Sequence, residues 1–107
     1  MPLATRRDIG QYLIGSMPGT TIPVELRSLA REFDLGGVIY FARNVIEPAQ
    51  VAELSREVGS LARHWPFWIS VDQEGGRVAR FKAPFTEWPP ARSIRVGADA
   101  EIRTTQL

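Results

Sequence analysis

The stretch FWISVDQEGGRVARF, residues 67–81, joins an apolar run directly to a polar loop. Residues 67–71 are apolar and β-prone, which predicts a short strand. The chain becomes polar immediately afterwards, at Asp72. In parallel α/β folds, ligand-binding residues gather at the carboxyl ends of the strands. Asp72 is therefore the first candidate for a ligand-binding residue.

Two further strands and two helices are expected upstream. Residues 11–17 are a short apolar run closed by Pro18-Gly19, which predicts a buried first strand and a turn. Residues 38–41 are continuously β-prone, as expected of a parallel strand covered on both faces. Pro23 and Pro48 each suit the first turn of a helix. The apolar positions with helical spacing are Leu26, Leu29, Ala30 and Phe33 after the first proline, and Val51, Leu54, Val58 and Leu61 after the second.

An alternation of strand and helix with short connections predicts a parallel α/β sheet with right-handed crossovers. An open doubly wound sheet and a closed (β/α) barrel both begin in this way. A barrel of this kind takes ~250 residues, and three parallel strands cannot close one. Residues 99–107 have the composition of a helix that is just beginning, without a stop signal. We therefore expect residues 1–107 to be a partial domain, truncated at the C-terminus.

The composition excludes several classes of partner and chemistry. The 107 residues carry a net charge of +1 and no cysteine, so disulfides, thiolate metal sites and thiol catalysis are excluded. Arg6-Arg7 is too short a basic run for a nucleic-acid patch. Neither a signal peptide nor a membrane span is recognisable. We expect a cytoplasmic protein with no nucleic-acid or membrane partner.

The loop after Asp72 combines acceptors and donors. Gly75-Gly76 allows a sharp turn or close approach to a ligand, and Arg77 and Arg80 bring guanidinium donors to the same loop. A carboxylate and a guanidinium together suit sugar hydroxyls, which both donate and accept hydrogen bonds. From Asp72 onward, more than 20 residues rich in proline precede the next expected helix, and so long a connection is usually functional or disordered.

Structural roles are also open for these residues. Asp72 and Glu74 could cap a turn or a helix, and an Asp-x-Glu pair offers too few ligands to argue for Mg²⁺ or Ca²⁺. Arg77 could form an ion pair with Glu74 as readily as contact a sugar. Arg43-Asn44 follows the second strand, where a ligand contact or a turn would explain the pair equally well.

The aromatic residues and the single histidine favour structural interpretations. Trp65, Trp68 and Trp88 could stack on a sugar, but the first two flank or fill the third strand and are expected in the core. His64 is expected at a helix C-terminus, where a cation is favourable without a catalytic role.

Residues 72–81 resemble the signature at the third strand of glycoside hydrolase family 3, in its bacterial β-N-acetylhexosaminidase branch. Residues 36–44, the helix after Pro48 and residues 85–91 are similar to the same family. The resemblance implies a TIM-type (β/α) barrel, of which residues 1–107 would form the N-terminal portion, about three β/α units with parallel strands. It implies removal of terminal β-linked N-acetylglucosamine from peptidoglycan or chitin fragments, without a metal or organic cofactor.

The resemblance assigns a binding role to two residues and a catalytic role to none. The aspartate and arginine that match Asp72 and Arg80 contact the terminal N-acetylglucosamine in this branch. The family's nucleophilic aspartate and its histidine-aspartate acid/base pair are expected beyond Leu107. The alternatives are a family 3 β-glucosidase, which usually has a different sequence after this aspartate, and a non-catalytic sugar-binding remnant. A nucleotide-binding domain is disfavoured because no Gly-x-Gly-x-x-Gly motif follows the first strand.

Overall fold

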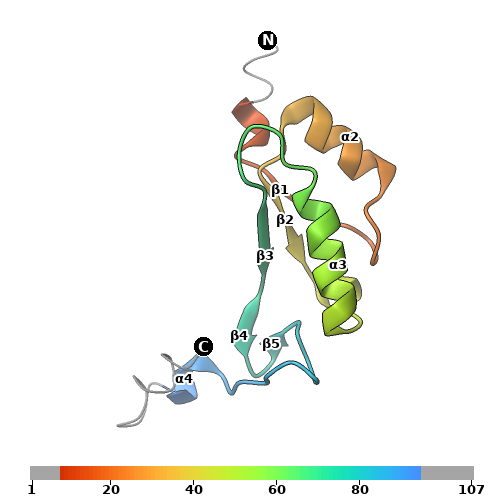
Figure 1. Cartoon of the computed structure of the whole chain (residues 1–107). Helices are drawn as coiled ribbons and strands as arrows, with labels where there is room; N and C mark the ends of the chain where they lie inside the picture. The colour runs from red at the N-terminus through yellow and green to blue at the C-terminus, as the bar shows by residue number, and fades with distance from the viewer. Residues whose placement is uncertain (1–7, 95–107) are drawn as a thin grey trace. The chain divides into compact units, whose positions relative to one another are not determined.

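The computed structural model describes residues 8–94 of the chain (Figure 1). The elements in chain order are β1 (Ile14–Gly15), α2 (Val24–Phe33), β2 (Gly37–Tyr40), the 3-10 turn η1 (Ala42–Asn44), α3 (Pro48–Gly59), β3 (Trp68–Val71), β4 (Gln73–Gly75), β5 (Val78–Ala79) and α4 (Ala91–Ile94). The chain divides into two compact units, with the boundary between Val71 and Asp72. Arg6-Arg7 and the helix expected near Asp99 lie outside the described residues.

The first unit is a parallel β/α arrangement, as predicted. Its three strands lie in the order β1-β2-β3 and pair in parallel. Gly37 to Tyr40 of β2 pair in register with Trp68 to Val71 of β3. Helices α2 and α3 form the two crossovers and lie on one side of the strands in Figure 1. The α/β class and the expectation of parallel strands are therefore confirmed.

The helical periodicity correctly identifies most of the core between the helices and the sheet. Pro48 is the first residue of α3, whereas Pro23 is the N-cap of α2. The buried apolar side chains of the two helices are Leu26, Ala30, Val51, Leu54 and Val58. Leu29, predicted on the same stripe, is 46% exposed. It lies at the edge of the stripe, and only the Leu26–Ala30 line packs inward. Leu61 lies beyond the end of α3 at Gly59.

The first strand is shorter than predicted. Backbone N–H groups of Tyr12 and Leu13 donate to the carbonyls of Ile9 and Gly10, both at 3.0 Å, so turn structure continues to Leu13. Only Ile14–Gly15 then pairs with β2. The predicted burial of residues 11–17 is wrong for Tyr12, Leu13 and Ile14, which are exposed.

The expectation that Trp65 and Trp68 are core residues is also wrong for residues 8–94. Trp68 is 73% exposed, and Trp65 is exposed as well. A strand of a closed barrel has one face toward the helices and the other toward the barrel interior, and three strands enclose no interior. Strand β3 is at the edge of the three-stranded sheet, so it has a neighbouring strand on one side only among residues 8–94.

The second unit begins with a β-hairpin where the sequence indicated only a polar loop. Strands β4 and β5 pair antiparallel, with Gln73 opposite Ala79 and Gly75 opposite Val78, and the register shifts between Gln73 and Gly75. The rings of Phe81 and Phe85 stack with centroids 4.7 Å apart. The hairpin holds the residues after Asp72 in a defined arrangement.

No helix within residues 8–94 is long and apolar enough to cross a membrane.

Candidate functional site

The turn of the hairpin requires glycine. Gly75 and Gly76 have φ angles of 88° and 61°, in the left-handed region. A Cβ on Gly75 would lie 2.3 Å from the carbonyl oxygen of Pro89. The N–H of Gly76 donates to the carbonyl of Trp88 at 3.0 Å. The segment at Trp88 and Pro89 therefore packs directly on the glycine turn. This contact explains why residues 85–91 and the hairpin sequence belong to the same structural motif.

The side chain of Gln73 holds the far strand of the hairpin. Its Oε1 accepts hydrogen bonds from the backbone N–H groups of Arg80 at 2.8 Å and Phe81 at 3.1 Å. Its Nε2 donates to the carbonyl of Phe81 at 3.1 Å. These three bonds extend the short β4–β5 ladder by one step. As a result, the backbone at Arg80 is held close to Gln73, which directly follows Asp72 in the chain.

Asp72 and Arg80 are brought together by this hairpin. A guanidinium nitrogen of Arg80 lies 3.8 Å from a carboxylate oxygen of Asp72, and the two side chains are 28% and 46% exposed. At this distance the pair is an ion pair without a closed hydrogen bond. The carboxylate carries hydrogen-bond acceptors and the guanidinium carries donors, which is a combination that suits a hydroxyl group.

Glu74 and Arg77, the other charged residues of the loop, make no ion pair with each other in the described part of the chain. Glu74 and Arg77 are exposed. Among the ion pairs of residues 72–94, the one observed joins Arg80 to Asp72, so the alternative pairing of Arg77 with Glu74 is not seen there. No cluster of three or more potential metal-ligating His, Cys, Asp or Glu side chains occurs within residues 8–94. The donor set of this loop is suited to hydroxyl groups.

Asn44 has a structural role that sequence reasoning left open. It is fully buried, and its Nδ2 donates to the carbonyls of Met17 and Gly19 at 2.9 and 2.6 Å. Its Oδ1 accepts from the N–H of Phe41 at 2.8 Å. The loop after β1 is thereby tied to the loop after β2. Arg43 is exposed, and its guanidinium donates to the Met17 carbonyl and lies 4.7 Å from the centre of the Phe41 ring. The turn explanation therefore accounts for Asn44.

His64 is exposed and lies past α3, which ends at Gly59 rather than at the histidine as expected. Trp88 is half-buried, with its backbone carbonyl bonded to the glycine turn.

The described fold and loop define a parallel β/α protein with a polar hairpin directly after its third strand. Residues 5–105 match the glycosyl hydrolase family 3 N-terminal domain, and the chain therefore belongs to that family. The fold corresponds to the start of the family's TIM-type barrel, which decides between the two architectures that begin with these elements.

The chain is similar to several bacterial enzymes. It is 43% identical over 76 residues to a beta-hexosaminidase of Photobacterium profundum, covering 71% of this chain and 22% of the relative. It is 45% identical over 82 residues to a beta-hexosaminidase of Nitrosomonas eutropha, covering 77% of this chain and 23% of the relative. The chain thus spans less than a quarter of the length of these relatives.

Two solved structures have a similar fold. A glycoside hydrolase family 3 beta-N-acetylglucosaminidase from Paenibacillus sp. superposes with a TM-score of 0.83 at 38% identity, covering 94% of this chain and 20% of that structure. NagZ from Neisseria gonorrhoeae, solved in complex with N-trifluoroacetyl-D-glucosamine, superposes with a TM-score of 0.76 at 27% identity, covering 88% of this chain and 29% of that structure.

Proposed function

We propose that residues 1–107 are the N-terminal part of an O-glycosyl hydrolase that removes terminal β-linked N-acetylglucosamine. The family match and the beta-hexosaminidase relatives support the reaction class. The Neisseria gonorrhoeae structure supports the substrate class, because its ligand is an N-acylated glucosamine. The observation within this chain that carries the proposal is the Asp72–Arg80 pair, which the β4–β5 hairpin brings together.

In this proposal Asp72 and Arg80 bind the sugar and take no part in bond cleavage. The carboxylate of Asp72 accepts hydrogen bonds from sugar hydroxyls, and the guanidinium of Arg80 donates to hydroxyl oxygens. Charge-assisted hydrogen bonds of this kind contribute about 1.5–3 kcal/mol each. Held in one geometry by Gln73 and the glycine turn, the pair orients the ring, which is a condition for attack at the anomeric carbon.

Bond cleavage requires groups that we do not assign to residues 1–107. A retaining glycosidase needs a carboxylate nucleophile and a separate acid/base, and the proposal places both in the remainder of the barrel. Neither a metal nor an organic cofactor is needed for that chemistry. The 107-residue chain by itself is then a sugar-binding segment.

The proposal also names a natural substrate and a cellular compartment. Fragments of peptidoglycan or chitin fit because both carry terminal β-linked N-acetylglucosamine. The cysteine-free composition is compatible with a reducing cytoplasm. The proposed partner is a small carbohydrate, with neither nucleic acid nor membrane involved.

The test is hydrolysis of 4-nitrophenyl N-acetyl-β-D-glucosaminide and 4-nitrophenyl β-D-glucoside. Each substrate is offered to the 107-residue chain and to a version extended through the downstream reading frame. We expect the extended protein alone to act, with a strong preference for the N-acetylglucosaminide. A preference for the glucoside would contradict the proposed substrate and favour a family 3 β-glucosidase.

A further inference from the structure

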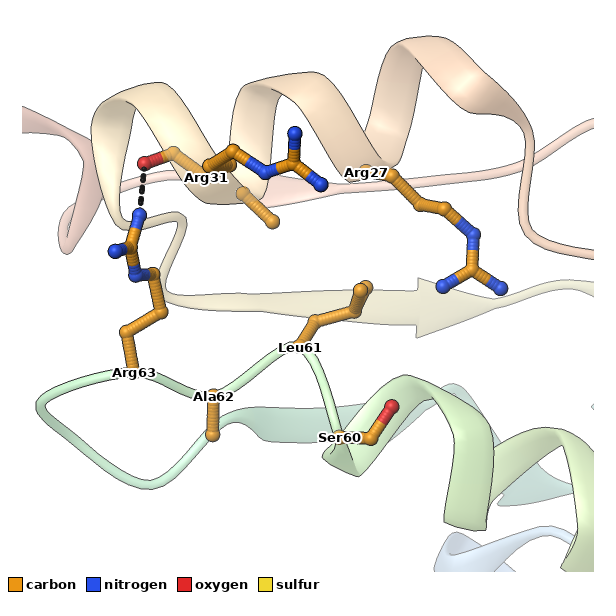
Figure 2. A pocket seen from close by; sticks show the side chains of 7 residues that line it. Arg27, Arg31, Ser60, Leu61, Ala62 and Arg63 are labelled. Carbon is orange, nitrogen blue, oxygen red and sulfur yellow. Dashed lines mark hydrogen bonds between the residues drawn. The ribbon is translucent and has the colours of Figure 1, made fainter.

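A cavity lies in the first unit (Figure 2). It has a volume of about 300 Å³, at the small end of the range for small-molecule sites. Helix α2 forms one wall and the segment that follows α3 forms the other. The lining residues are Arg27, Ala30, Arg31, Ser60, Leu61, Ala62 and Arg63.

Three of the seven lining residues are arginines and none is acidic. Figure 2 shows Arg27 and Arg31 extending from α2 and Arg63 extending from the opposite segment. The carboxylate of Glu57 on α3 lies 4.0 Å from a guanidinium nitrogen of Arg27, with 41% of its side chain exposed. One carboxylate against three guanidinium groups leaves an excess of positive charge, which favours an anion.

The guanidinium groups are arranged on two separate segments. Arg63 donates to the backbone carbonyl of Arg31 at 2.7 Å, which spans the cavity from one wall to the other. A guanidinium has five N–H donors, so this bond leaves donors of Arg63 for a ligand. Arg27 and Arg31 are four residues apart on one helix, where like charges repel. An arginine in the last turn compensates the helix dipole, but this explains Arg31 and not Arg27.

We propose that this cavity binds a small phosphate-bearing ligand. Guanidinium groups match phosphate oxygens in pairs, and three of them line this cavity, two from α2 and one from the facing segment. The remaining lining includes Ala30, Leu61 and Ala62, which offer apolar surface to a small organic body. A phosphomonoester has both parts.

The proposal is tested by isothermal titration of the 107-residue chain with phenyl phosphate, inorganic phosphate and phenol. We expect phenyl phosphate to bind more tightly than inorganic phosphate, and phenol not to bind. The variants R31Q and R63Q should each weaken phenyl phosphate binding about tenfold, because each removes a charge-assisted contact. E57Q should tighten it about threefold, since it removes the competing carboxylate.

R56Q is the matched control. Arg56 is exposed and paired with Glu53, and it does not line the cavity, so the variant makes the same change in net charge within the same unit. Its affinity should stay within about twofold of the parent. Absence of phenyl phosphate binding to the parent chain would overturn the proposal. An equal loss of phenyl phosphate affinity in R56Q and R63Q would also overturn it, because that result would mean that the ligand is attracted by the general surface charge and not by the cavity. If R31Q does not fold, the affinities of R63Q and E57Q for phenyl phosphate still test the proposal. Glu57 is half-exposed and Arg63 is exposed, so both variants are expected to fold.

Discussion

The side-chain carbonyl of Gln73 accepts a hydrogen bond from the backbone N–H of Arg80 at 2.8 Å. Arg80 is the residue whose guanidinium faces Asp72, 3.8 Å away. A single amide side chain thus sets the backbone position of one member of the proposed sugar-binding pair. Gln73 is a positioning residue in this account, and Asp72 and Arg80 are the contact residues.

The Gln73 relationship predicts a local change in Q73A. The amides of Arg80 and Phe81 lose their acceptor in this variant, so their hydrogen exchange should accelerate about tenfold or more. Residue-resolved exchange by NMR measures the effect. Q73E keeps the acceptor oxygen, and it should largely preserve protection at both amides.

Q50A is the control for this experiment. Gln50 makes a comparable pair of bonds, accepting from the N–H of Ile46 at 2.8 Å and donating to the carbonyl of Asn44 at 3.0 Å. Exchange should accelerate at Ile46 and stay unchanged at Arg80. If Q73A left the Arg80 amide as protected as before, the positioning role of Gln73 would be wrong.

Replacement of Gly75 by alanine should loosen the hairpin turn. The φ angle of 88° is strained for alanine, and the new Cβ would collide with the Pro89 carbonyl, so G75A should cost about 1–3 kcal/mol. The urea transition of the Trp88 indole resonance reports on the segment that packs there. G59A has open space around its new Cβ at the end of α3, and a change of less than about 1 kcal/mol is expected. Equal midpoints for the two variants would refute the packing described.

Loss of Asn44 should destabilise the first unit. N44A removes bonds to Met17, Gly19 and Phe41 from a fully buried site, and the free energy of unfolding should fall by about 2–3 kcal/mol. Urea denaturation followed by circular dichroism measures the change. R43A is the comparison, because Arg43 is exposed and donates to the same Met17 carbonyl, and a loss below about 1 kcal/mol is expected. A larger loss in R43A than in N44A would show that the link between the loops depends on the arginine.

The core positions could be predicted because they follow from local spacing. Val51, Leu54 and Val58 recur at helical intervals after Pro48, and all three are buried. Exposure at Trp68 could not be predicted from the same pattern. Its apolar, β-prone surroundings indicate a buried strand, but burial depends on which elements cover the strand, and local spacing carries no information about that.

The candidate site was predicted in part. The position of Asp72 after an apolar strand marks it as a candidate, and the family resemblance adds Arg80 as a second sugar-contacting residue, but the ion pair between them is seen only in the structure. The hairpin between them was missed because β5 has only two residues, too few for a periodic signal. The contacts of Asn44 with Met17 and Gly19 join residues 27 and 25 positions apart, and local spacing carries no information about such pairs.

Stability should fall at alkaline pH because of Tyr40. Burial raises the pKa of its phenol above the ordinary value of 10.0, and the hydrogen bond with Ser55 at 3.0 Å offsets part of that rise. The folded state therefore retains a proton that the unfolded state loses, so this contribution is complete below about pH 10 and is lost as the pH rises further.

The test is the urea midpoint between about pH 8 and about pH 11. Y40F should lose about 1 kcal/mol near neutrality through its missing hydrogen bond, and it should show a shallower alkaline decline. Y12F is the matched control, because Tyr12 is exposed, and its pH profile should follow the parent. A Y40F profile parallel to the parent would exclude Tyr40 as the source of the decline.

The most direct test of the Asp72–Arg80 sugar site is steady-state hydrolysis of 4-nitrophenyl N-acetyl-β-D-glucosaminide by the extended protein carrying D72A or E74A. Asp72 and Glu74 are carboxylates of the same loop, and only Asp72 faces Arg80 among the described ion pairs. We predict that D72A lowers kcat/KM by about 10–100-fold and that E74A changes it less than about threefold. Unchanged kcat/KM in D72A, or an equal loss in E74A, would contradict the account.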